Sequence, residues 1–128
     1  MKASFILFFT LATLLASCKK ETYELNQEFT LDFNKTAIVN IDGVPCELTF
    51  TNLEKESRCP EGVYCLAIGE VGVKINLNKE QDALMGFDSE FKPTTAFKNH
   101  TIHLLDVSYG KRANYGKEKR YSVKLRVD

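Results

Sequence analysis

The sequence predicts an all-β protein: an antiparallel β-sandwich of about seven to eight strands that follows an apolar N-terminal segment. Apolar and polar residues alternate along several segments, as expected for strands with one buried and one solvated face. No long stretch after the N-terminus repeats apolar residues at helical spacing. Short turn-forming sequences separate the alternating segments, and this arrangement is typical of a β-sandwich.

The first expected strands lie close to the N-terminus of the domain. Apolar residues alternate over 29–33, and the segments 36–41 and 44–50 are rich in β-branched and apolar residues. Asp42-Gly43 lies between the last two segments. A two-residue Asp-Gly turn predicts a β-hairpin, because both turn residues need positive φ. Pro45 cannot donate a hydrogen bond to a neighbouring strand, so it is expected at a strand start or edge.

The clearest strand is 71–77, in which Val, Ile and Leu alternate with Gly, Lys and Asn. The segments 102–104 and 121–127 repeat this alternation. The segment 82–98 fits either two short strands or one strand with a loop. Together with the N-terminal strands, these segments give the seven to eight strands expected for the sandwich.

The N-terminal sequence predicts an export signal. A positive charge at Lys2 precedes residues 5–16, which are almost wholly apolar. This run of about 12 residues is shorter than the roughly 20 that a helix needs to cross a bilayer, and its length suits a signal peptide. The alternatives are a transmembrane helix, against which the short length argues, and an ordinary cleaved signal, against which Cys18 at the expected cleavage position argues.

The sequence Leu15-Ala16-Ser17-Cys18 resembles the lipobox of bacterial lipoproteins, in which the cysteine is acylated and becomes the first mature residue. The resemblance implies a signal peptide over 1–17, a lipidated N-terminus and linker over 18–22, and a β-sandwich domain over 23–128. It also implies three acyl chains on Cys18, and two are enough for stable anchoring. Because Lys19 rather than Asp follows the cysteine, the resemblance implies the outer membrane of a Gram-negative bacterium, on either side.

Composition narrows the expected partners. The chain of 128 residues balances 17 basic against 17 acidic residues, and removal of 1–17 takes away only Lys2. The remaining 111 residues suffice for one domain with its own core. A nearly neutral domain does not attract nucleic acid through its bulk charge. We therefore expect the membrane as a partner through Cys18, an envelope protein or glycan as a further partner, and no nucleic acid.

Three cysteines remain once Cys18 carries lipid: Cys46, Cys59 and Cys65. An oxidising compartment favours one disulfide and leaves one thiol. Cys59 and Cys65 are the expected pair, because the Pro and Gly between them favour a turn. Closing so short a loop contributes about 2 kcal/mol in the chain-entropy account. Cys46 lies in an alternating apolar run and is expected to be buried, although a pairing with Cys59 or Cys65 is an alternative.

The segment 56–69 resembles a pattern that recurs in small secreted bacterial proteins. In that pattern an acidic residue and Ser precede Arg-Cys-Pro, and a second Cys leads to Trp and Gly. The resemblance covers roughly residues 36–127 and implies a secreted β-domain without an assigned reaction. The chain departs from the pattern at Glu56, where Asp is usual, and at Ala67, where Trp is usual. Arg58 is expected to hold Glu56 or another carboxylate, or to present a recognition loop.

The segment 109–121 is the best candidate binding surface, because cations alternate with tyrosines along it. Aromatic rings beside cations can stack on sugars or contact phosphate-rich lipid headgroups. A long polar hairpin connection is the alternative interpretation. The candidate binding residues are Lys111, Arg112, Tyr115, Lys117, Lys119, Arg120 and Arg58.

Sequence signals for catalysis are weak. His100 and His103 lie three residues apart on an expected strand, so they face opposite sides and would not share a metal. The spacing of Cys59 and Cys65 fits neither zinc nor redox motifs. We therefore expect no metal, no cofactor and no catalytic residue, with a hydrolase as the alternative.

The expected function is a non-catalytic binding or accessory module anchored by lipid to the cell envelope. The alternative is a structural lipoprotein of a larger envelope assembly, in which an exposed strand edge makes the contact.

Overall fold

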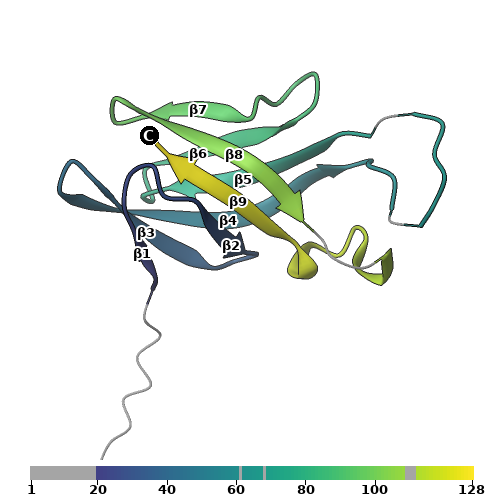
Figure 1. Cartoon of the computed structure of the whole chain (residues 1–128), viewed down its shortest axis with the longest axis horizontal. Coiled ribbons are helices and arrows are strands. Elements are labelled where there is room, and N and C mark those ends of the chain that lie inside the picture. Colours follow the sequence, from purple (N-terminus) through teal and green to yellow (C-terminus); the bar gives the residue numbers. More distant parts are fainter. Residues whose placement is uncertain (1–19, 61, 68, 109–111) are drawn as a thin grey trace, which may run out of the picture.

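The computed structural model describes residues 20–60, 62–67, 69–108 and 112–128. Within these ranges the chain forms strands in two sheets, which pack face to face as a β-sandwich (Figure 1). The five-stranded sheet has the order β1-β3-β4-β5-β6, with β1 at Thr22–Tyr23, β3 at Thr36–Ile41, β4 at Val44–Glu56, β5 at Val71–Leu77 and β6 at Gln81–Phe87. The four-stranded sheet has the order β2-β9-β8-β7, with β2 at Phe29–Asp32, β9 at Ser122–Val127, β8 at His100–Ser108 and β7 at Thr94–Phe97.

The predicted antiparallel sandwich is confirmed, with nine strands in the described ranges rather than seven to eight and with one exception in strand direction. β1 pairs in parallel with β3, so that Thr22 lies opposite Ile38. The chain then crosses from the five-stranded to the four-stranded sheet before β2. Tyr23 of β1 stacks on Phe29 of β2, with ring centroids 4.5 Å apart. This aromatic pair joins the two sheets where the chain crosses.

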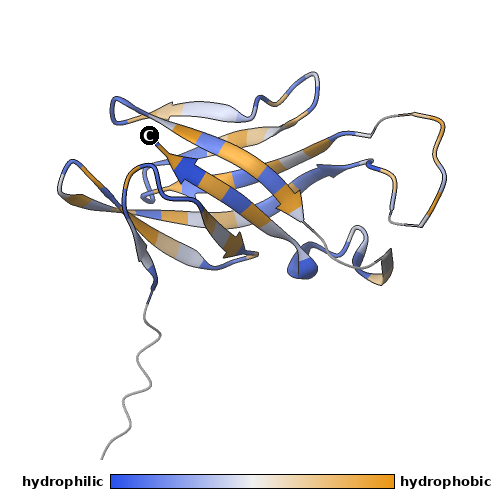
Figure 2. Ribbon diagram, in the orientation of Figure 1, coloured by the Kyte–Doolittle hydropathy of each residue, from blue (hydrophilic) through white to orange (hydrophobic). Residues whose placement is uncertain are grey.

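The core lies between the sheets and follows the alternation in the sequence. Figure 2 shows hydrophobic residues alternating with hydrophilic ones along the strands. Every second residue of β3, β5 and β9 is buried, and each Val, Ile or Leu among them contributes roughly 1.5–3 kcal/mol when fully removed from water. The largest fully buried side chains are Tyr121, Phe50, Leu48, Ile75, Leu77, Met85, Ile102 and Leu125.

The hairpin between β3 and β4 turns at Asp42-Gly43, as predicted. Both residues have positive φ, 53° and 79°. β4 is longer than expected, because the predicted strand ends at Phe50 and the observed one continues to Glu56. Register shifts between Phe50 and Asn52 and again between Leu53 and Lys55 break the alternation. Such bulges bend a strand and obscure its period in the sequence.

The segment 82–98 resolves into two strands, β6 and β7, which belong to different sheets. The connection between them links the sheet edges. Gly86 N donates to Lys92 O at 3.1 Å, and Leu104 N donates to Pro93 O at 2.7 Å. The adjacent carbonyl oxygens of Lys92 and Pro93 therefore accept hydrogen bonds from strands of both sheets.

Two long connections leave the sandwich at the same end (Figure 1). One joins β4 to β5, and the other joins β8 to β9 and contains the short 3-10 helices η1 (Arg112–Asn114) and η2 (Glu118–Arg120). We call the described parts of residues 57–70 and 112–121 the loop end. Among the helices of the described segments, none has the length and apolar character to cross a membrane.

Candidate binding site at the loop end

A disulfide closes the β4–β5 connection. Cys59 and Cys65 are bonded, with their Cα atoms 5.8 Å apart, so the expected pairing is confirmed. The alternative pairing through Cys46 is wrong, because this residue faces the core from β4 and is fully buried with a free thiol. Burial raises the pKa of the Cys46 thiol. Cys46 therefore behaves as a small apolar core residue.

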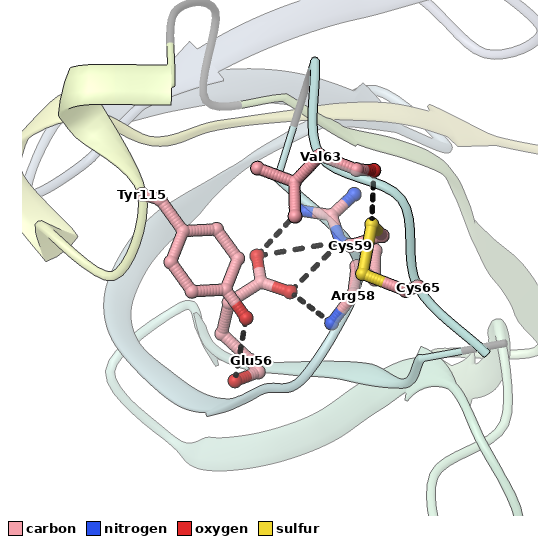
Figure 3. Close-up of a disulfide and its surroundings, with 6 residues drawn as sticks. All are labelled: Glu56, Arg58, Cys59, Val63, Cys65 and Tyr115. Carbon is pink, nitrogen blue, oxygen red and sulfur yellow. Dashed lines mark hydrogen bonds and ion pairs between the residues drawn. A yellow bond between two sulfur atoms is a disulfide. The ribbon is translucent and has the colours of Figure 1, made fainter. Parts of the chain in front are cut away.

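Arg58 and Glu56 form a fork-like ion pair beneath the disulfide loop (Figure 3). Arg58 Nη2 lies 2.7 Å from Glu56 Oε2, and Arg58 Nε donates to Oε1 at 3.0 Å. The backbone N–H of Arg58 donates to the same Oε1 at 2.9 Å. The Glu56 side chain is only 5% exposed. The expected contact between Arg58 and a carboxylate is confirmed, and it fixes the start of the loop.

Arg58 also connects the two long connections. Its Nη1 donates to the carbonyl oxygen of Val107 at the end of β8, at 2.6 Å. Tyr115, from the β8–β9 connection, donates from its Oη to Glu56 O at 3.4 Å (Figure 3). Residues 49 and 59 positions apart in sequence thus meet at one charged cluster.

Tyr121 supports the cluster from the core side. Its Oη accepts a hydrogen bond from Gly116 N at 2.8 Å, and its side chain is 1% exposed. Burial, with a further contribution from the Glu56 carboxylate, raises the pKa of Tyr121 to about 12. This tyrosine therefore stays neutral at physiological pH and holds the turn at Gly116 against the core.

Glu118 has a role that the sequence does not reveal. Its Oε2 accepts a hydrogen bond from the backbone N–H of Leu53 at 2.8 Å, between residues 65 positions apart. Leu53 lies in the irregular part of β4, where a bulge disrupts the regular pairing. The one acidic residue among the cations of 111–120 is thus directed towards β4, and no local sequence signal indicates this contact.

The cations beside Glu118 face solvent. Lys117, Lys119 and Arg120 are exposed, and among the described residues none of the three forms an ion pair. A shallow depression of about 390 Å³ is lined by these cations and Glu118. Of the other predicted binding residues, Lys111 lies outside the described residues. Arg112 begins η1, and the placement of its side chain is not described.

Two apolar side chains, one within the disulfide loop and one directly after it, are almost fully exposed. Tyr64 is 90% and Leu66 is 95% exposed, the highest values among the large hydrophobic residues described. They belong to the β4–β5 connection, which the Arg58–Glu56 pair holds at its start and the disulfide closes between Cys59 and Cys65. The loop end therefore combines exposed apolar groups and exposed cations on a supported base.

The two histidines lie away from this site and contact different carboxylates. His100 Nε2 lies 2.9 Å from Asp42 Oδ2, and His103 Nε2 lies 2.8 Å from Asp128 Oδ1. Within the described ranges, no three His, Cys, Asp or Glu residues come together as a set that could hold a metal ion. The loop end is thus the part of the described chain with the clearest features of a contact surface.

Comparison with known proteins adds no relative: the chain matches no protein-family model, no curated protein and no solved structure. The candidate site therefore rests on geometry and chemistry.

Proposed function

We propose that the protein is a lipid-anchored envelope protein that acts as a non-catalytic binding module through its loop end. The observation that carries this proposal is that Tyr64 and Leu66 are exposed at the same end of the sandwich as the exposed Lys117, Lys119 and Arg120. Binding residues are commonly found on loops that a rigid scaffold positions. Here the scaffold is the sandwich, and Arg58 and Tyr115 fasten the loops to it.

The anchor in this proposal is Cys18, which follows the signal peptide 1–17. The linker to β1 at Thr22 is short, because four residues of extended chain span at most about 14 Å. The domain would therefore stay close to the membrane surface that holds the acyl chains. The proposed location is the outer membrane of a Gram-negative bacterium.

A second candidate function is supported by the edge strand β6, which suits a structural lipoprotein of a larger assembly. Leu84 and Phe87 of β6 are 48% and 41% exposed. Gly86 directs its N–H away from β5 towards Lys92, so the backbone groups of Leu84, two residues earlier, point to the same side. Exposed strand edges of this kind can pair with a strand from another protein.

Both proposals can be tested in intact cells and on protein purified from their envelopes. We expect an intact mass that begins at Cys18 and includes the added acyl chains. We also expect a photo-reactive amino acid in place of Tyr64 to form cross-links in intact cells, and one in place of Leu84 to form far fewer.

An intact mass that still includes Met1, or that shows Cys18 without acyl chains, would contradict the proposed lipid anchor. Cross-links from position 84 without any from position 64 would favour the assembly function over the loop-end function. A photo-reactive residue at Asp106, which is exposed on β8, serves as the background control.

A further inference from the structure

We propose that the loop end binds an anionic lipid surface, with Tyr64 and Leu66 entering the headgroup region and Lys117, Lys119 and Arg120 contacting phosphates. This inference deepens the proposed function, and it rests on that proposal for placing the domain in the envelope. It names the class of partner, a bilayer that carries anionic headgroups.

The first argument is the shape of the apolar tip. The β4–β5 connection extends beyond the ends of the strands (Figure 1), and it carries Tyr64 and Leu66 with 90% and 95% of their surface exposed. A protein partner would need a cavity complementary to this protrusion. A bilayer adapts to it, and tyrosine suits the membrane interface because its ring is apolar and its hydroxyl polar.

The second argument is charge. Lys117, Lys119 and Arg120 are exposed at the same end and form no ion pair with any described residue. Glu118, between them, is occupied by the N–H of Leu53 and does not neutralise them through an ion pair in the described chain. Each cation near an anionic membrane strengthens binding by roughly fivefold.

The third argument is preorganisation. The disulfide between Cys59 and Cys65 and the Arg58–Glu56 ion pair hold the apolar loop, and Tyr115 and Tyr121 hold the cationic one. Segments that are already held at their bases lose less conformational entropy on binding than free segments do. Modest contacts at the tip can therefore produce net attachment.

The absence of tryptophan from the chain makes a direct test possible. Tyr64→Trp introduces a single tryptophan, which can be excited selectively, into the β4–β5 connection of the lipidated protein. Val44→Trp is the matched control, because Val44 is 54% exposed beside the Asp42-Gly43 turn, far along β4 from the loop end. Both variants are reconstituted in vesicles of phosphatidylethanolamine and phosphatidylglycerol that contain brominated lipid.

We expect blue-shifted emission and quenching by brominated lipid at position 64, and neither change at position 44. Reversal of Lys117, Lys119 and Arg120 to Glu should abolish both changes at position 64. Vesicles of phosphatidylcholine with the same proportion of brominated phosphatidylcholine should likewise give neither change for the Tyr64→Trp variant that keeps its three cations.

Unquenched emission from the Tyr64→Trp variant, equal quenching at both positions, or quenching that persists after charge reversal would overturn the inference. A shift that requires added envelope proteins would also overturn it, because the partner would then be a protein. The intact mass of the same preparation separates the two proposals. If the Tyr64→Trp protein is acylated but its emission is unquenched, this inference is contradicted while the proposed lipid anchor is still supported.

Discussion

At the scale of single residues, Arg58 does the most to define the loop end. It contacts both oxygens of Glu56 and the carbonyl of Val107, and the Glu56 carboxylate is nearly excluded from solvent. A buried ion pair contributes little in itself, because desolvation opposes the attraction between its charges. Loss of one partner is costly, however, because it leaves the other charge buried and alone.

We therefore predict that Arg58→Ala destabilises the fold by about 3 kcal/mol, measured as a lower midpoint of urea unfolding. Arg58→Lys should fall between the parent and Arg58→Ala, because a lysine keeps the charge but cannot form the fork. The control is Lys124→Ala, which removes the exposed Lys124–Glu28 pair and should change stability by less than about 1 kcal/mol. If Arg58→Ala leaves the midpoint of urea unfolding unchanged but abolishes binding of the loop end to anionic vesicles, Arg58 would instead belong to the binding surface itself.

At the scale of elements, β5 and β6 approach each other closely at a pair of glycines. Gly72 lies opposite Gly86, and the ring of Phe91 covers Gly72 on the outer side of the sheet. A Cβ atom added at Gly72 would lie 2.2 Å from Phe91 Cδ2, whereas one added at Gly86 would lie 2.3 Å from the backbone oxygen of Val71. A larger residue at position 72 would thus clash with a side chain, whereas one at position 86 would clash with the backbone.

This difference predicts a contrast between two substitutions. Gly72→Ala should destabilise the parent by about 1–3 kcal/mol, as expected for overpacking, and by much less in a Phe91→Ala background. Gly86→Ala should destabilise both backgrounds equally, because the Val71 carbonyl remains in place. Urea unfolding of the single and double variants measures the coupling, and an unchanged cost of Gly72→Ala without the Phe91 ring would contradict the assignment.

At the scale of the whole molecule, polar contacts between the sheets hold each end of the sandwich. The Arg58–Val107 contact joins them at the loop end. At the other end, His100 of the four-stranded sheet contacts Asp42 in a turn of the five-stranded sheet at 2.9 Å. The hydrogen bond to Asp42 is the main cause that raises the pKa of His100, and Asp128 adds to it.

The raised pKa of His100 predicts a pH-dependent stability. The folded state holds the proton more tightly than the unfolded chain, so the contribution is complete below the ordinary histidine pKa. It is lost as the pH rises from the ordinary histidine pKa through the raised pKa of the folded state. The urea midpoint should fall over this range, and Asp42→Asn should reduce the fall.

The control for this prediction is Asp106→Asn, which changes an exposed carboxylate on the same strand as His100. It should keep the pH dependence of the parent. An Asp42→Asn variant that loses stability with pH as steeply as the parent would show that the contact between the sheets does not depend on the proton.

Much of this protein could be predicted from local sequence. Alternation identified the buried faces of strands such as 71–77, because a strand turns successive side chains to opposite sides. Asp42-Gly43 predicted its hairpin, and the Pro-Gly turn between Cys59 and Cys65 predicted the disulfide. Even the Arg58–Glu56 ion pair could be predicted from the sequence, because the two residues are near neighbours in the chain.

Only the tertiary structure decided which strands are neighbours and which side chains form the loop end. The parallel pairing of β1, the Phe91 ring over Gly72 and the Glu118 contact with Leu53 all join residues distant in the chain. Residue order carries no local signal for such contacts, because they form only when two sheets pack and their connections meet. The sequence itself determined where each strand turns its apolar face, and packing determined what those faces and loops touch.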